Sequence, residues 1–311
     1  MLLSTSSSKG AGSRAGIIYL LAGLAIFSIA IELGANVAFA RVSRIQKRIL
    51  GEYHAAQRVQ QVSADGKPTL LLTGNSLLLE GLDLPKTQAT LAPRYSVSRF
   101  VVEQTEYLDW FFGTRRLLAE GARPAILVLT LPTGHLISSG TRGEYFARHQ
   151  MQAGDIVEVA QASRLDMTTA SNFWFAHFSE WLGSKAEIRK VFLAQALGNL
   201  DALASRVTNP NNSIPSDEAI EGILAPRLQA LKAVCESYGV RLVLMLPALP
   251  DAQEKVNGVT AACRRNRIPV LQPYLPGELT SAYFRDGFHL NAAGENLFTA
   301  RFCNRLLEGS L

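Results

Sequence analysis

Two short stretches of this chain carry residues that could perform nucleophilic catalysis. In the first, residues 69–74 read as a buried strand that runs directly into Asn75 and Ser76. A serine at the carboxyl end of a strand is well placed to be a nucleophile, because ligands bind beyond that edge of an open α/β sheet. The serine needs a base. The second stretch, near the end of the chain, offers one in His289, which follows Asp286 after two intervening residues.

The spacing of Asp286 and His289 suits a base and the group that orients it. In a tight loop the carboxylate can accept a hydrogen bond from one imidazole nitrogen, while the other nitrogen faces outward as a base. Gly287, between them, allows the loop unusual backbone angles. Taken singly, a serine after a strand is more often a turn or helix cap, and a lone histidine often only satisfies backbone groups. Their joint occurrence favours the catalytic interpretation.

The elements that must position these residues alternate between strands and helices. Strands are expected at residues 69–74, 95–100, 125–131, 240–246 and 269–271, and helices at 102–120, 216–238, 251–266 and after Asn291. Residues 142–207 read as a helical, aromatic-rich insertion. The alternation predicts a mostly parallel sheet with right-handed crossovers. Both stretches then end on the same edge of the sheet.

The N-terminal region predicts a membrane anchor. Residues 16–31 carry no charge, and apolar character resumes after Glu32 as far as Ala40. About 20 residues span a bilayer core, so we expect a transmembrane anchor at 16–40, preceded by a cytoplasmic or disordered segment at 1–15. A signal peptide cleaved after Ala40 is the alternative. We expect Glu32 near the membrane interface, and the alternative is a functional intramembrane carboxylate.

The basic excess of the chain is confined to the flanks of this anchor. The formal charge is +5, and the first 48 residues account for all of it, with six basic residues against one acidic residue. Residues 41–68 are therefore read as a basic stalk, and a nucleic-acid partner is not expected. Counting the basic residues on either side slightly favours a cytoplasmic domain.

The two stretches resemble the SGNH (GDSL-type) hydrolases, with Gly74-Asn75-Ser76 in place of the usual Gly-Asp-Ser and Asp286-Gly-Phe-His289 near the C-terminus. The resemblance covers about residues 69–131 and 216–308. It implies Ser76 as nucleophile, His289 as base and Asp286 as its orienter. It also implies a flavodoxin-like three-layer α/β/α sandwich for residues 69–311, with no metal or organic cofactor.

The chain departs from this family where oxyanion donors are expected. The family has a Gly after the second strand and an Asn after the third, and neither is found here. The Ser76 amide, Asn75, Thr133 and Gly134 are the candidate substitutes. Arg142 could hold a polar substrate, although a salt bridge with a nearby acid is the simpler role. The three cysteines lack metal-ligand spacing.

The resemblance implies an esterase or O-acyltransferase acting on acyl esters, with acetyl esters expected first, of a cell-envelope carbohydrate. It also implies a single-pass protein of the inner (plasma) membrane with a periplasmic or extracellular domain, against the charge count. Membrane O-acyltransferases or polysaccharide machinery are the implied protein partners. The alternative is a degenerate, non-catalytic SGNH domain that serves as a partner in a polysaccharide modification or assembly complex.

Overall fold

A parallel sheet forms the centre of the protein. The computed structural model describes residues 11–186, 189, 215–250 and 255–309. Five parallel strands follow the order β2-β1-β3-β4-β5, and they are β1 (Thr69–Gly74), β2 (Ser96–Val101), β3 (Ile126–Thr130), β4 (Arg241–Met245) and β5 (Val270–Leu271). This is the doubly wound, flavodoxin-like order, in which the chain reverses direction across the sheet between β1 and β3. The α/β fold expected from the sequence is confirmed.

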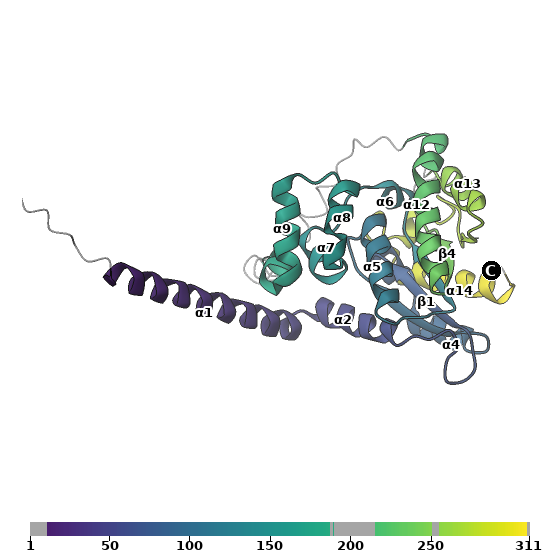
Figure 1. Cartoon of the computed structure of the whole chain (residues 1–311). Helices are drawn as coiled ribbons and strands as arrows, with labels where there is room; N and C mark the ends of the chain where they lie inside the picture. The colour runs from purple at the N-terminus through teal and green to yellow at the C-terminus, as the bar shows by residue number, and fades with distance from the viewer. Residues whose placement is uncertain (1–10, 187–188, 190–214, 251–254, 310–311) are drawn as a thin grey trace, which may run out of the picture.

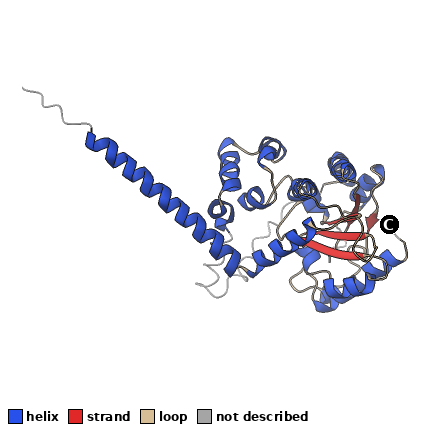
Figure 2. Cartoon of the chain, turned by 60° about the horizontal axis from the view of Figure 1, so that its bottom comes forward, coloured by secondary structure: helices blue, strands red, loops and turns tan. Residues whose placement is uncertain are grey.

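Helices cover both faces of the sheet because its central strands are apolar on both sides. In β1, Leu71 faces one core and its neighbours Leu70 and Leu72 face the other, as the two-residue period of a strand requires. One face is covered by α2 (Arg44–Gln57), α5 (Tyr107–Ala119), α12 (Asp217–Ser237) and α13 (Asn257–Arg265). The other is covered by α3 (Ser76–Leu79), α4 (Leu84–Leu91) and α14 (Ala292–Leu307). Figure 2 shows the strands enclosed between these layers.

The expected insertion is helical over the part that the structure describes. It comprises α7 (Glu144–His149), the short η1 (Ala153–Asp155), α8 (Ile156–Ala162) and α9 (Met167–Phe178), and it lies beside α5 (Figure 1). An aromatic chain holds it there, since the ring centroid of Phe146 lies 6.0 Å from that of Phe112 in α5 and 6.3 Å from that of Phe173 in α9. Residues 187–188 and 190–207 of the expected insertion lie outside the described residues.

Helix α1 (Ala11–Val42) extends away from the sheet (Figure 1). Its segment Gly16–Val37, with a mean hydropathy of 2.2, is long and apolar enough to cross a membrane, and its most apolar 18-residue stretch is not buried in the protein. A signal sequence would meet the same criteria. Only Ser43 separates α1 from α2, and its hydroxyl caps α2 by accepting a hydrogen bond from the amide of Gln46.

The segment expected to be a basic stalk contains α2, which packs on the sheet. Ile49 and Ala56 are buried in the core beneath it. The carboxylate of Glu52 accepts hydrogen bonds from the Arg99 guanidinium, at 2.8 Å, and from the amide of Val101, at 2.9 Å. Residues 44–57 are thereby part of the folded domain.

Candidate active site

Ser76 is placed by the end of β1, where the chain turns sharply. Gly74, the last residue of β1, passes so close to β3 that a Cβ atom would lie 2.5 Å from the carbonyl oxygen of Thr130. Only glycine fits this approach. Asn75 then caps α3, its side-chain oxygen accepting a hydrogen bond from the amide of Leu77 at 3.1 Å. Ser76, half-buried, is the first residue of α3.

Asp286 and His289 sit on a closed loop between the short η2 (Ser281–Tyr283) and α14. An antiparallel bridge between Phe284 and Leu290 joins the ends of the loop, and the amide of Arg285 donates to the carbonyl of His289 at 2.8 Å. Gly287 has φ +93°, a conformation that other residues rarely adopt. The loop therefore holds the carboxylate and the imidazole side by side.

The structure brings the three residues together in one hydrogen-bonded row. His289 Nδ1 lies 2.8 Å from Asp286 Oδ2, and His289 Nε2 lies 2.9 Å from Ser76 Oγ. Because a carboxylate can only accept, Nδ1 carries the proton and Nε2 is left to accept the proton of the Ser76 hydroxyl. This is the geometry of a nucleophile, a base and its orienter.

Asp286 is ionised over nearly the whole pH range. Partial burial pushes its pKa upward, but a hydrogen bond from the His289 ring and bonds from the amides of His289 and Phe288 outweigh that effect. Together they lower the pKa of Asp286 to about 2. The carboxylate is thus available to orient His289 and to stabilise an imidazolium.

The side chain of Asn75 joins three segments at the carboxyl edge of the sheet. Its amide nitrogen lies 2.8 Å from His135 Nδ1 and 3.3 Å from the carbonyl oxygen of Thr105, while its oxygen accepts from Leu77. These contacts fix the orientation of the amide, because the Leu77 amide can only donate and the Thr105 carbonyl can only accept. In this arrangement both amide hydrogens of Asn75 are directed at neighbouring protein atoms.

The other residues proposed from the sequence lie around this edge with contacts of their own. The hydroxyl of Thr133, at the start of α6 (Thr133–Ile137), donates to the carbonyl of Lys255 at 3.2 Å. Gly134 is exposed, with open space where a side chain would lie. The guanidinium of Arg142 lies 4.0 Å from the ring centroid of Tyr145, and its amide donates to Asp109.

Sequence reasoning missed the loop after β2 as a support of the site. Gln104, at φ +59°, adopts the left-handed conformation that favours glycine. The hydroxyl of Thr105 donates to the carbonyl of Val102 and accepts from the indole of Trp110, so the Thr105 carbonyl is held towards Asn75. A buried threonine after a strand carries no distinctive sequence signal. His135 is half-buried against Asn75.

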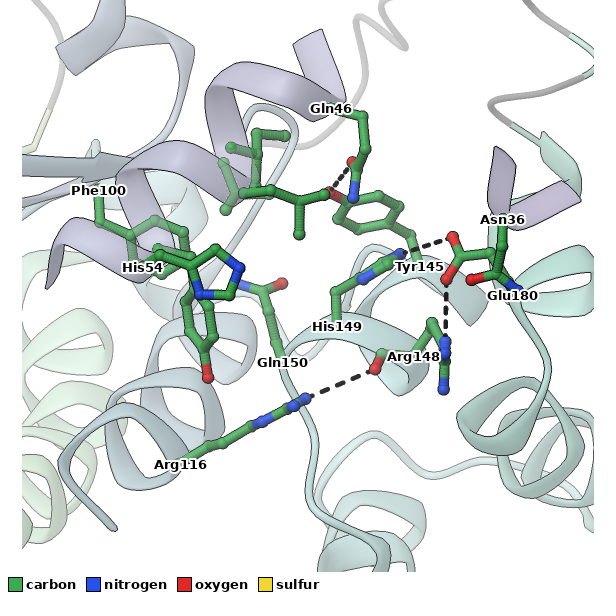
Figure 3. Close-up of a pocket in the computed structure, with 14 residues that line it drawn as sticks. Asn36, Gln46, His54, Phe100, Arg116, Tyr145, Arg148, His149, Gln150 and Glu180 are labelled. Carbon is green, nitrogen blue, oxygen red and sulfur yellow. Dashed lines mark hydrogen bonds and ion pairs between the residues drawn. The ribbon is translucent and has the colours of Figure 1, made fainter. Parts of the chain in front are cut away.

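A separate cavity of about 330 Å³ lies between α1, α2, α5 and α7 (Figure 3). Its lining includes Asn36, Gln46 and Tyr145, and none of the three residues of the Ser–His–Asp row. It lies on the α2 side of the sheet, whereas Ser76 and His289 begin or precede helices of the opposite layer. Gln150, 2% exposed, borders the cavity, and within the described part of the chain the nitrogen and oxygen of its side chain have no hydrogen-bond partner. This cavity is not the substrate site of Ser76.

A metal site is not part of this arrangement. Within the described ranges, no group of three or more His, Cys, Asp or Glu side chains is placed to hold an ion. The chemistry available at the edge of the sheet is that of a serine hydroxyl, an imidazole and a carboxylate.

Comparison with known proteins gives limited help. No family model and no curated protein matches the chain. Similar solved structures include an alpha/beta hydrolase enzyme from the metagenome of Lake Arreo, Spain, with 10% identity, a TM-score of 0.40, and coverage of 80% of this chain and 96% of that chain. A catalytic mutant of an acetylxylan esterase from Geobacillus stearothermophilus has 9% identity, a TM-score of 0.41, and coverage of 76% and 93%. The structure of TesA has 13% identity, a TM-score of 0.40, and coverage of 78% and 99%. Likenesses this distant identify neither the activity nor the substrate of this chain.

Proposed function

We propose that this chain is a membrane-tethered serine esterase or O-acyltransferase of the SGNH type. The observation that carries the proposal is the single row in which His289 Nε2 lies 2.9 Å from Ser76 Oγ and His289 Nδ1 lies 2.8 Å from Asp286. Its position beyond β1, where the strand order reverses, is where open α/β sheets bind their ligands.

The reaction would proceed through an acyl-enzyme. Ser76 Oγ attacks the ester carbonyl while its proton passes to His289 Nε2, giving a tetrahedral intermediate and an imidazolium paired with Asp286. The intermediate collapses as the imidazolium protonates the leaving alcohol. Water, or a sugar hydroxyl, then attacks the acyl group with His289 again as base, and Ser76 regains its proton.

The backbone amide of Ser76 would be the first hydrogen-bond donor to the oxyanion of the intermediate. That amide is the first N–H of α3 and, like the other leading amides of a helix, has no partner within the helix. Asn75 serves this site by holding α3 and its neighbouring loops in place, because its amide hydrogens face His135 and Thr105. Loss of one oxyanion donor can cost on the order of 10²–10³ in rate, so we expect a modest turnover on simple esters.

Acyl esters, acetyl esters among them, of a cell-envelope carbohydrate are the proposed substrates, by resemblance to the SGNH family. The same acyl-enzyme serves hydrolysis and transfer, and the acceptor decides between them. Supplying an acetyl donor with and without a carbohydrate acceptor separates the two: free acetate indicates an esterase, and an acetylated acceptor indicates a transferase.

The decisive experiment asks whether Ser76 is activated. A fluorophosphonate probe should label the full-length protein on Ser76, as located by peptide mass spectrometry, and Ser76→Ala should abolish the labelling. Activity on 4-nitrophenyl acetate should disappear with it. If wild-type protein neither reacts with the probe nor hydrolyses any ester tried, the catalytic proposal fails.

A non-catalytic role is the second candidate, and one observation favours it. The family's second and third oxyanion donors are absent from the sequence, and Asn75, which could have replaced one, directs its hydrogens at protein atoms. Such a domain would act as a binding partner within membrane O-acyltransferase or polysaccharide machinery. It predicts that Ser76→Ala complements a deletion strain as well as wild type, whereas an esterase or transferase predicts that it does not.

Tethering through α1, with the domain on the periplasmic side of the inner membrane, is the third part of the proposal. Its support is the length and apolarity of Gly16–Val37. A reporter that is active only in the periplasm, fused after Leu311, should be active. An inactive fusion, with a cytoplasm-only reporter active at the same position, would reverse the orientation.

A further inference from the structure

Four large aromatic side chains are exposed at the end of α9 and just after it. Trp174, Phe175, Phe178 and Trp181 are 42%, 60%, 60% and 43% exposed. The opposite side of α9 is used for packing, since Phe173 and Ala176 are buried against the rest of the insertion. Among the residues that the structure describes, this aromatic surface, defined as these four residues, is not covered by other parts of the domain.

The segment that contains Trp181 and follows α9 is bound directly to α1. The carboxylate of Glu32 accepts hydrogen bonds from the hydroxyl of Ser179, at 2.8 Å, from the amide of Trp181, at 3.3 Å, and from the amide of Glu180. These are the residues that follow α9, where the chain enters its next helical segment. In Figure 1 the end of α9 accordingly lies close to the domain-proximal end of α1.

The depth of this contact follows from the position of Glu32 in the apolar segment. Glu32 precedes Val37, the end of that segment, by five residues, or about 7–8 Å of helix. Residues hydrogen-bonded to Glu32 therefore lie level with the outer part of the bilayer that α1 would cross. Tryptophan and other aromatic residues concentrate at that level in membrane proteins. Beyond it, Arg44 and Lys47 are exposed, at the height of anionic headgroups.

We propose that the aromatic surface inserts into the interfacial layer of the same bilayer that α1 crosses, so that the domain rests on the membrane. The inference rests on the proposed transmembrane role of α1. Hydrogen bonds from residues 179–181 satisfy the Glu32 carboxylate, which allows a charged residue within the apolar segment. Lipid is the occupant favoured by continuity with α1, by the aromatic composition and by the basic residues beside it.

The three tryptophans of the chain make the proposal measurable. Trp110 is 1% exposed and serves as an internal reference. The full-length protein is reconstituted in phosphatidylcholine–phosphatidylglycerol vesicles whose acyl chains are brominated near the headgroup, and tryptophan emission is compared with that in unbrominated vesicles. The variant with Trp174→Phe and Trp181→Phe isolates Trp110. Adding Leu275→Trp to that variant, at a position 60% exposed and remote in the fold from α1, gives a water-facing control.

We expect brominated lipid to quench the emission contributed by Trp174 and Trp181, and to spare Trp110 and the tryptophan at position 275. Aqueous acrylamide should show the reverse preference between the aromatic surface and position 275. Carbonate extraction, run on the same vesicles, reports separately whether α1 is inserted. Protein that resists extraction but is quenched only by acrylamide keeps its tether and refutes the contact. If neither quencher reduces the emission of Trp174 and Trp181, protein covers the aromatic surface, and the proposed lipid contact is also refuted. If carbonate extracts the protein from the vesicles, both the transmembrane tether and the lipid contact are refuted.

Discussion

At the scale of single residues, the site separates a chemical role from a positioning role within two neighbouring positions. Ser76 presents its hydroxyl to His289, whereas Asn75 links α3 to the loops after β2 and β3 through Leu77, Thr105 and His135. The two residues should therefore respond differently to mutation. Loss of the Ser76 side chain removes the proposed nucleophilic oxygen. Loss of the Asn75 side chain weakens the contacts that hold α3 and the loops after β2 and β3 in place.

We expect Ser76→Ala and His289→Ala each to reduce ester hydrolysis on the order of 10³–10⁶-fold. The double variant should be little worse than either single variant, because members of one catalytic unit are strongly non-additive. Neither side chain is in the core, so the free energy of unfolding should change by less than about 1 kcal/mol. Steady-state kinetics and urea denaturation measure the two effects. Full activity of Ser76→Ala on every substrate would exclude Ser76 as the nucleophile.

Asn75→Ala should lower the free energy of unfolding by about 1–3 kcal/mol, because it removes a helix cap and leaves buried acceptors without donors. Activity should fall as well, since α3 carries Ser76. Gly134→Ala is the matched control on the same rim, where an added methyl group meets open space, and it should unfold like wild type. Equal stability of Asn75→Ala and wild type would show that the Asn75 contacts do not hold the frame.

The contribution of Asp286 to the free energy of unfolding should change with pH only in the acidic range. Its pKa in the folded protein, about 2, is below the ordinary value of 3.8, so folding favours the ionised form. That contribution is complete above pH about 4 and is lost as pH falls through about 2. The advantage of wild type over Asp286→Asn, measured by urea denaturation, should therefore shrink across this interval and stay constant above it. A difference that grows on acidification would contradict the assigned role of the carboxylate.

At the scale of elements, the strands and most helices could be predicted because the local periodicity of apolar residues indicates each of them. The strand expected at residues 125–131 is β3 at Ile126–Thr130, and the helix expected at 216–238 is α12 at Asp217–Ser237. The helix expected from residue 102 begins at Tyr107, because Gln104 adopts a left-handed conformation and Glu106 starts a capping box. Such loop geometry depends on tertiary contacts that a single sequence does not reveal.

The Ser–His–Asp row could be predicted from the sequence, whereas the contacts that support it could not. Ser76, Asp286 and His289 are marked by glycine neighbours and by their places at the ends of elements. The partner of Asn75, the Thr105 carbonyl, is a backbone atom that any residue could supply. The packing of α2 was also hidden, because its basic, polar sequence masks the burial of Ile49 and Ala56.

The loop that carries Asp286 and His289 should be sensitive to the backbone of Gly287. Replacing it by Ala places a side chain at φ +93° in otherwise open space, at a conformational cost of about 1–2 kcal/mol. We expect a larger loss of kcat/KM than such destabilisation explains, because the loop would shift both catalytic groups. Gly121→Ala is the control: φ there is +114°, also in open space, but at the end of α5. It should lose similar stability and keep its activity.

At the scale of the whole molecule, the switch between β1 and β3 places residues from both ends of the domain in one site. The three helices nearest the C-terminus pack on opposite faces of the sheet, α12 and α13 on one and α14 on the other. Each carries one cysteine, and all three cysteines are buried and free. The thiols therefore report on the integrity of both layers.

Native protein should resist thiol reagents at neutral pH. Burial raises the pKa values of Cys235 and Cys263 to about 12 and also raises that of Cys303, so few reactive thiolates form. In denaturant without reductant, all three cysteines should react, as measured by maleimide mass shifts. Fewer than three reactive thiols in the unfolded chain would reveal a disulfide. Rapid labelling of native protein would show that a helical layer opens.

The junction at Ser43 has a consequence for how far the active site can reach. Were residues 41–68 a flexible linker, the catalytic domain could wander over about 30 Å from its anchor. With α2 docked on the sheet and one residue between α1 and α2, that freedom is removed. Under the proposed tethering, Ser76 would keep a nearly constant height and orientation above the lipid, and the proposed enzyme would not search for its substrate on a flexible linker. If the substrate is the proposed carbohydrate polymer, turnover would be governed by how the polymer is delivered along the membrane surface more than by its bulk concentration.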